Sequence, residues 1–200
     1  MTPTLKTDIC VIGAGAAGLS VASGAAQLGL KVALIEKGDM GGDCLNTGCV
    51  PSKSLIAAAS RAKTFSDSRK FGISFHHPDI DFAAVKNHMT DVINRIAPHD
   101  SQERFEKLGV RVFREAAEFV SNRKVRTGQT EITSKYFVIA TGSRPFVPDI
   151  SGMDQDKIYT NETIFSLQQA PPKLVVIGGG PIGVEMAQAH ARLGSDVTLI

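Results

Sequence analysis

The chain has 200 residues, a balanced composition and a formal net charge of +2 at pH 7, as expected for an ordinary globular protein with one or two domains. Its lysines and arginines form no run and tryptophan is absent, so we predict no nucleic-acid partner and no anionic membrane surface. No apolar run approaches the ~18 residues of a membrane-spanning helix, and residues 1–7 hold no signal-peptide core. With three cysteines, two of them close together, we expect a cytoplasmic protein whose thiols do chemistry.

Residues 8–36 have the pattern of a βαβ unit. Residues 8–12 form a short apolar run without polar alternation, which predicts a strand buried on both faces. A Gly-rich turn then leads into a small-residue helix that is expected to stop at Gly29. Residues 31–35 predict a second parallel strand, with Glu36 at its C-terminal end.

The turn carries a dinucleotide-binding fingerprint at Gly13, Gly15 and Gly18. In such a turn the first glycine permits the tight bend, the second lets the backbone approach a pyrophosphate, and the third lets helix and strand pack closely. The helix N-terminus offers N–H groups to the phosphates, and Glu36 is placed to bind ribose hydroxyls. We therefore expect a nucleotide site, the alternative being a Gly-rich turn in an unrelated α/β fold.

The middle of the chain predicts helices followed by strands. Residues 51–65 and 82–108 read as helices, the second interrupted before Pro98, with a loop at 71–81 between them. Five short β-type runs follow, separated by Ser-Asn and Gly-Gln turns, and they predict an antiparallel meander. The five runs cover residues 110–114, 118–120, 124–126, 131–133 and 136–139.

Residues 173–200 repeat the βαβ pattern, with glycines at Gly178, Gly180 and Gly183, a helix to about residue 193 and a strand at 196–200. In the first unit, the acidic residue follows the first glycine by the offset from Gly13 to Glu36. The same offset from Gly178 points just past Ile200, to the position that would distinguish NADH from NADPH. We therefore expect this chain to be an N-terminal fragment of a longer protein.

Cys44 and Cys49 lie five residues apart. On a regular helix this spacing gives a rise of about 7.5 Å, more than the usual ~4.4–6.8 Å between the Cα atoms of a disulfide. A bridge therefore requires a distorted turn, which Gly48 and Pro51 permit. A helix is expected to begin near Cys49, and its N-terminus and the nearby Lys53 favour a thiolate there.

Two other interpretations of the cysteines remain. They could bind a metal together with His76 and His77, but adjacent histidines lack the usual gap of a zinc motif, and we predict no metal site. They could also be inert buried thiols. That interpretation fits Cys10 in its apolar strand, but not two cysteines flanked by Gly, Asn and Lys.

The segment Gly-Gly-Asp-Cys-Leu-Asn-Thr-Gly-Cys-Val-Pro-Ser-Lys at residues 41–53 resembles the active-site signature of the class I flavin-dependent pyridine nucleotide–disulfide oxidoreductases. This family includes dihydrolipoamide dehydrogenase, glutathione reductase and mercuric reductase. The likeness extends through both fingerprints and the Ala-Thr-Gly segment at 140–142. It implies an α/β fold with a Rossmann-like FAD-binding domain at 1–150, built from a parallel sheet plus an antiparallel β-meander. A connector at 151–172 and the first βαβ unit of a Rossmann-like NAD(P)-binding domain at 173–200 follow.

The resemblance also implies which residues bind the two cofactors. The implied FAD ligands are Gly13, Gly15, Ala16, Gly18, Glu36, Gly42, Asp43, Lys53, Ala117, Ala140, Thr141 and Gly142. The implied NAD(P)H ligands are Gly178, Gly180, Ile182 and Gly183. Asp43 stands where many members carry Thr, and this substitution is more like the mercuric-reductase-like branch.

By the same resemblance Cys49 matches the thiol that faces the flavin, and Cys44 matches the thiol that exchanges with substrate. Lys53 matches the lysine near flavin N5, where a cation stabilises the reduced ring. Glu185 matches the acid that pairs with this lysine, the alternative being a plain surface glutamate. Catalytic roles are thus implied for Cys44, Cys49, Lys53 and Glu185.

Other positions depart from the family or are given no role. Pro181 stands where some members carry a tyrosine that gates the nicotinamide pocket. The histidines at 88, 99 and 190 are interpreted as surface or helix residues, not as substitutes for the family's catalytic histidine.

The implied activity passes electrons between NAD(P)H and a small thiol, disulfide or metal-ion substrate, through FAD and a redox-active Cys44–Cys49 disulfide. Mercuric-reductase-like and dihydrolipoamide-dehydrogenase-like substrates compete, and a nucleotide-binding redox sensor without turnover is the alternative. The full-length parent is expected to be a homodimer joined by a C-terminal domain. The 200-residue chain alone is expected to be inactive and to bind flavin poorly.

Overall fold

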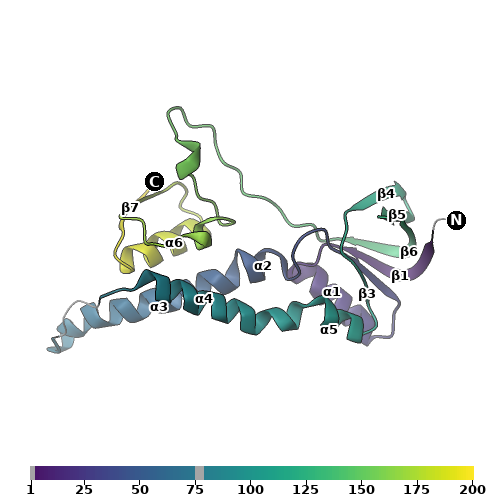
Figure 1. Ribbon diagram of the computed structural model, residues 1–200, viewed down its shortest axis with the longest axis horizontal. Helices are drawn as coiled ribbons and strands as arrows, with labels where there is room; N and C mark the ends of the chain where they lie inside the picture. Colours follow the sequence, from purple (N-terminus) through teal and green to yellow (C-terminus); the bar gives the residue numbers. More distant parts are fainter. Residues whose placement is uncertain (1–2, 75–78) are drawn as a thin grey trace. The chain divides into compact units, whose positions relative to one another are not determined.

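The computed structural model describes residues 3–74 and 79–200 and divides into two compact units (Figure 1). The first unit comprises Met1–Asn46 and Asn94–Arg144, and the second comprises Thr47–Ile93 and Pro145–Ile200. Each unit therefore combines two separate stretches of chain. Every helix in the described residues is too short or too polar to cross a membrane.

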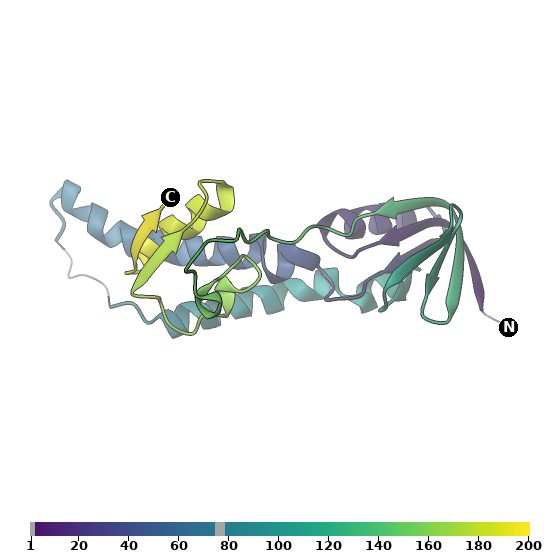
Figure 2. The same ribbon diagram turned by 90° about the horizontal axis from the view of Figure 1, so that it is seen from above.

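A six-stranded sheet in the order β3-β2-β1-β6-β5-β4 is the centre of the first unit. Its strands are β1 Thr4–Ile12, β2 Val32–Ile35, β3 Arg111–Phe113, β4 Ala117–Ser121, β5 Lys124–Thr127 and β6 Thr130–Ile139. Its helices are α1 Ala16–Gln27, α2 Gly42–Asn46, the 3₁₀ helix η2 Ala97–Asp100 and α5 Gln102–Lys107. The strands β3, β2, β1 and β6 are parallel, whereas β6, β5 and β4 are antiparallel (Figure 2). The predicted parallel sheet extended by a meander is confirmed.

Two details of the predicted meander are wrong. The run at 110–114 forms β3, which is not in the meander but pairs in parallel with β2 at the opposite edge of the sheet. The runs at 131–133 and 136–139 are one strand, because polar Ser134 stays in register with Thr7 of β1 instead of turning. Neither partner strand is adjacent in sequence, so local patterning could not identify it.

Strand β2, which the sequence predicted only as a second parallel strand, is buried on both faces. Successive side chains of a strand point to opposite faces. Val32 and Leu34 accordingly pack in a core with α1 and α5, whereas Ala33 and Ile35 pack in another with Cys10 of β1. Cys10 is fully buried, and burial raises the pKa of its thiol to about 12. A thiol held neutral in an apolar core is inert, as predicted for this cysteine.

The second unit contains a long helix pair and the second βαβ unit. Its helices are α3 Cys49–Asp67, the 3₁₀ helix η1 Ser68–Phe71, most of α4 Phe82–Ile96, the 3₁₀ helices η3 Gln155–Lys157 and η4 Ile164–Ser166, and α6 Pro181–Arg192. Its strands are β7 Lys173–Val176 and β8 Asp196–Leu199, which pair in parallel. The second βαβ unit predicted from sequence is confirmed. In Figures 1 and 2 α6 runs along α3.

The core of the second unit lies between α3, η4 and α6. It contains Leu55 and Ala59 from α3, Ile164 from η4, and Met186, Ala189 and Leu193 from α6. Residues of the segment predicted as a connector, 151–172, thus contribute to this core. The predicted domain limits themselves stay a prediction.

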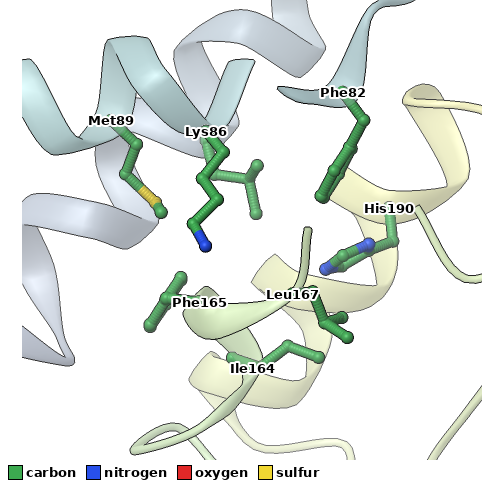
Figure 3. A pocket seen from close by; sticks show the side chains of 8 residues that line it. Phe82, Lys86, Met89, Ile164, Phe165, Leu167 and His190 are labelled. Atoms are coloured by element: carbon green, nitrogen blue, oxygen red, sulfur yellow. The ribbon is translucent and has the colours of Figure 1, made fainter. Parts of the chain in front are cut away.

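His190 lies on α6 as predicted, but its side chain is buried, with only 1% of its surface exposed. It lines a small apolar pocket with Phe82, Lys86 and Leu167 (Figure 3). Neither ring nitrogen has a hydrogen-bond partner among the described residues, and burial lowers the pKa of the imidazole. His88, by contrast, is exposed on α4.

Candidate functional site

The first Gly-rich loop follows β1 and leads into α1. Gly13 has a φ of 106°, and a Cβ at this position would lie 2.1 Å from the carbonyl oxygen of Ala140. A Cβ on Gly18 would lie 1.8 Å from the carbonyl oxygen of Gly13. The N-cap of α1 is Gly15, and no side chain from the described residues caps this end. Glycine is therefore required at both clashing positions, and the N-terminus of α1, which starts at Ala16, keeps N–H groups for an anion.

Glu36 is held at the carboxyl end of β2 by backbone donors. Its Oε2 accepts a hydrogen bond from the Ala14 N–H at 2.6 Å, and its Oε1 accepts one from the Gly38 N–H at 2.7 Å. The carboxylate thus lies beside the Gly-rich loop, as the fingerprint predicts. Arg114 Nη2 donates to the Gly38 carbonyl at 2.5 Å. Sequence reasoning missed this arginine, because no local pattern marks a residue that contacts a loop 76 positions away.

The start of α2 packs against the same loop. Gly42 has a φ of 56°, and a Cβ there would lie 2.6 Å from the Cα of Gly15. Asp43 is in the first turn of α2, and its Oδ2 would lie 3.9 Å from a Cβ on Gly142. Asn46 Nδ2 donates to the Gly42 carbonyl at 2.9 Å. Asn46 belongs to the signature at residues 41–53, although the sequence pattern alone indicated no role for it.

The end of β6 completes this group. The Ala140 N–H donates to the Ile12 carbonyl at 2.8 Å, which keeps residues 140–142, including Thr141, next to the loop after β1. Ala117 starts β4 and packs with the core that contains Ile35 and Phe113. The structure therefore gathers the predicted FAD ligands of residues 13–43 and 140–142 within the first unit, whereas Ala117 lies on the neighbouring strand pair.

The two predicted redox cysteines flank a break between helices. Cys44 lies in α2 and is half-buried, whereas Cys49 is the first residue of α3 and is exposed. The N-cap of α3 is Gly48, with φ −134° and ψ −116°, so the regular helix is interrupted between the two cysteines, as a bridge requires. Both residues carry thiols in this structure. The prediction that α3 begins near Cys49 is confirmed.

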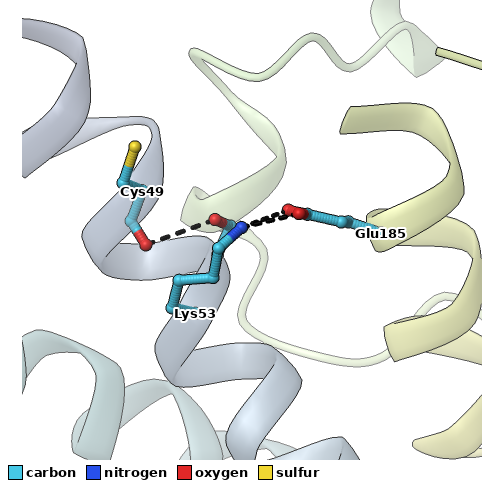
Figure 4. Close-up of polar contacts among 4 residues, drawn as sticks. Cys49, Lys53 and Glu185 are labelled. Atoms are coloured by element: carbon cyan, nitrogen blue, oxygen red, sulfur yellow. Dashed lines mark hydrogen bonds and ion pairs between the residues drawn. The ribbon is translucent and has the colours of Figure 1, made fainter. Parts of the chain in front are cut away.

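Lys53 and Glu185 form an ion pair within the second unit (Figure 4). Lys53 Nζ lies 2.7 Å from Oε1 and 2.6 Å from Oε2 of the glutamate. Lys53 is one helical turn after Cys49 on α3, and Glu185 is in the first half of α6. The two residues are 132 positions apart in sequence, so their contact links the helix of the signature to the helix of the second fingerprint.

The second Gly-rich loop repeats the backbone of the first. Gly178 has a φ of 111°, and a Cβ on Gly183 would lie 2.1 Å from the Gly178 carbonyl oxygen. Gly180 is the N-cap of α6, and Ile182 in the first turn is 58% exposed. The side chain of Ile182 is thus open to a ligand, and the N-terminus of α6 can accept an anion.

The alternative metal ligands His76 and His77 lie outside the described residues. Within residues 3–74 and 79–200, no group of three or more His, Cys, Asp and Glu side chains is arranged to hold a metal ion.

The chain matches, over residues 7–200, the family described as pyridine nucleotide-disulphide oxidoreductase. It is 38% identical to the dihydrolipoyl dehydrogenase of Buchnera aphidicola, covering 100% of this chain and 43% of that protein. It is 33% identical to a mercuric reductase of Lysinibacillus sphaericus, covering 96% of this chain and 35% of that protein. The chain thus spans about two fifths of the length of these curated relatives.

A solved structure shares the fold. The HOCl-induced flavoprotein disulfide reductase RclA from Escherichia coli, in a Cu(II) complex, matches with a TM-score of 0.81 and 30% identity. The match covers 96% of this chain and 41% of that one. The Rossmann-like α/β architecture expected from the sequence is confirmed.

Proposed function

Because the chain belongs to the pyridine nucleotide-disulphide oxidoreductase family, we propose that it carries the flavin site and the thiol pair of a FAD-dependent disulfide oxidoreductase. In this proposal electrons pass between NAD(P)H and a small thiol, disulfide or metal-ion substrate, through FAD and a Cys44–Cys49 disulfide. The observation that carries the proposal is the Lys53–Glu185 ion pair. It joins α3, which begins at Cys49, to α6, the helix of the second Gly-rich fingerprint.

The first unit fits the adenine-dinucleotide part of FAD. A Cβ at position 13, 18 or 42 would collide with the chain's own backbone, whereas one on Gly15 would make only an ordinary contact, 3.8 Å from Gly42 Cα. Gly15 is the glycine whose missing side chain would let a pyrophosphate approach the backbone. The N-terminus of α1 would bind the phosphates, and Glu36, held by two backbone N–H groups, would bind ribose hydroxyls. When bound, FAD supplies a ring that exchanges two electrons with a nicotinamide or with thiols.

The cysteines carry the disulfide chemistry. The Cys44–Cys49 disulfide takes up two electrons, which NAD(P)H supplies through FAD, and two protons, and becomes a pair of thiols. Cys44 Sγ, as thiolate, then attacks a substrate disulfide, so that one substrate thiol leaves with a proton and a mixed disulfide forms. Cys49 Sγ attacks Cys44 Sγ, which releases the second substrate thiol and restores the Cys44–Cys49 bond.

Lys53 and Glu185 would orient the electron-transfer site. The Glu185 carboxylate contacts the Lys53 ammonium group, which lies on the exposed side of α3. A cation there stabilises negative charge that develops nearby. The second loop, with Gly178 and the N-terminus of α6, would hold the phosphates of NAD(P)H.

The two candidate substrate classes correspond to the relatives. Dihydrolipoyl dehydrogenase and mercuric reductase match this chain at similar identity, so a dithiol and a thiophilic metal ion are both retained. A substrate dithiol would attack Cys44 Sγ in the Cys44–Cys49 disulfide and displace Cys49 as a thiolate, whereas a thiophilic metal ion would bind the Cys44 thiolate of the reduced pair.

Thiol counting tests the proposal directly. In the oxidised, FAD-loaded full-length protein, one equivalent of NADH or NADPH should create about two new thiols per chain, because a two-electron donor opens one disulfide. Cys44→Ser and Cys49→Ser should gain none. Cys10→Ala is the control and should gain the same number as the wild type, since Cys10 is buried away from this chemistry. Reduction of the flavin without new thiols in the wild type would contradict the proposal.

A further inference from the structure

Two polar contacts join α3 and α6 at matching positions. Lys53 pairs with Glu185 near the start of both helices. Farther along, Arg192 Nη1 donates to Ser60 Oγ at 3.3 Å. Ser60 follows Lys53 by seven residues, and Arg192 follows Glu185 by seven residues. The two helices therefore run parallel and in register over two turns, a length of about 10.5 Å.

The apolar surface between these contacts combines large and small side chains. Ala59 of α3 and Ala189 of α6 are almost completely buried, with 0% and 1% of their surface exposed, and Leu55 and Met186 pack in the same core. This packing sets the distance between the helices and contributes to their register. A hydrogen bond has narrow limits of distance and angle, so a polar contact specifies one register.

The two polar contacts differ in how strongly each can stabilise the packing of α6 against α3. The Lys53 and Glu185 side chains are 59% and 35% exposed, and exposed ion pairs add little to stability because solvent screens them. The contact between Arg192 and Ser60 is longer, at 3.3 Å, but it is partly buried, so solvent screens it less. The second contact is therefore better placed to fix the helices.

We propose that Arg192 and Ser60 are positioning residues that fix the register of α6 on α3 and thereby hold Glu185 against Lys53. The proposal rests on the function proposed above, because the ion pair matters for electron transfer only if it lies at the cofactor site. Neither residue touches the proposed thiol chemistry. Their effect reaches the site through the two helices alone.

A matched pair of substitutions isolates the hydrogen bond. Ser60→Thr keeps the hydroxyl group, whereas Ser60→Val has the same shape without it, and both add a β-branch to α3. Arg192→Met removes the donor from the other side and keeps an unbranched apolar side chain. A structural effect of the added methyl groups is common to the first two variants, so their difference reports the hydrogen bond.

The first measurement is zero-length carbodiimide cross-linking of Lys53 to Glu185 in the FAD-loaded full-length protein, quantified by mass spectrometry. Ser60→Thr should match the wild type, whereas Ser60→Val and Arg192→Met should give roughly fivefold less cross-link, as for loss of one hydrogen bond. The cross-link between Lys63 and Asp67, which pair within α3 at 3.0 Å, is the folding control. Equal Lys53–Glu185 yields in Ser60→Val and Ser60→Thr would overturn the inference, whatever the activity.

The second measurement is the limiting rate of flavin reduction by NADH or NADPH. Ser60→Val should lower this rate about fivefold relative to Ser60→Thr and should also raise KM, because α6 carries both Glu185 and the N-terminus that would hold the nucleotide phosphates. In a Lys53→Met background, Ser60→Val should have no further effect on this rate. If Lys53→Met reduces as fast as the wild type, the proposed role of the ion pair fails. If Lys53→Met is slow while Ser60→Val is not, the positioning role fails.

Discussion

In both βαβ units the first glycine of the loop has a strongly positive φ, 106° at Gly13 and 111° at Gly178. In both, a Cβ on the third glycine would collide with the carbonyl oxygen of the first, at 1.8 Å in the first unit and 2.1 Å in the second. The surroundings differ. A Cβ on Gly13 would meet the Ala140 carbonyl oxygen of β6 at 2.1 Å, whereas one on Gly178 would meet no atom of the described residues within 4 Å.

The second strands of the two βαβ units, β2 and β8, also differ in how far their surroundings bury them. All four residues of β2 are buried, whereas three of the four residues of β8 are exposed. The fingerprint therefore encodes the contact between loop and helix, which is the same in both units. The tolerance of the first glycine depends on the neighbouring strand, which the fingerprint does not encode.

In the 200-residue chain, Gly13→Ala is expected to have the largest total cost, and Gly178→Ala is its comparison. A non-glycine residue at positive φ costs about 1–2 kcal/mol, and this cost applies to both. Gly13→Ala should cost about 2 kcal/mol more, because its Cβ also overpacks against Ala140. Amide hydrogen exchange reports local opening free energies, and it should show this excess in β1 and α1 for Gly13→Ala. An equal loss of opening free energy at the two positions would mean that the end of β6 shifts to accommodate the new methyl group at no free-energy cost.

A second substitution tests the contact that the units share. Gly18→Ala and Gly183→Ala should each destabilise their own helix by about 2–3 kcal/mol, because the new methyl group collides with a backbone carbonyl. Gly24→Ala is the control in α1: a Cβ there meets no atom of the described residues within 4 Å. It should stabilise α1 by about 0.5–1 kcal/mol through helix propensity. Hydrogen exchange in α1 and α6 measures both, and a neutral Gly183→Ala would show that the second loop packs more loosely.

Local chemistry explains what the sequence could predict. The glycines of both loops, the start of α3 at Cys49 and the acid at Glu36 each depend on neighbours within one βαβ unit or one turn. The pairing of Lys53 with Glu185 came from resemblance to a family, since no local pattern links positions so far apart.

The missed features depend on distant partners. The edge position of β3 follows from its pairing with β2, and the contact of Arg114 with Gly38 joins the loops after those two strands. The hydrogen bond between Arg192 and Ser60 joins two helices that are far apart in sequence. Helical periodicity places His190 on α6, but only the packing of α4 and η4 buries it.

The smallest expected effect comes from a position where the two helices differ. Seven residues after the third glycine, α1 carries Ala25 and α6 carries His190, and both are buried. Burial lowers the pKa of His190 below its ordinary value of 6.5. In an open state of α6 the imidazole regains that ordinary pKa, so below pH 6.5 the open state binds a proton that the folded state does not. The opening free energy of α6 should be constant above pH 6.5. Below pH 6.5 it should fall by up to about 1.4 kcal/mol for each further step of one in pH.

Hydrogen exchange in α6 between pH 7.5 and pH 5 measures this effect, with the intrinsic pH dependence of exchange taken from unfolded peptides. Lys86 also lines the pocket, and its Nζ donates to the Ser166 carbonyl at 3.0 Å. His190→Leu should remove the acid-induced loss, and His88→Gln, at an exposed position, should keep it. The opening free energy of α1 should stay constant over this range, because Ala25 does not titrate. A pH slope in α6 that survives His190→Leu would assign the acid sensitivity to another group.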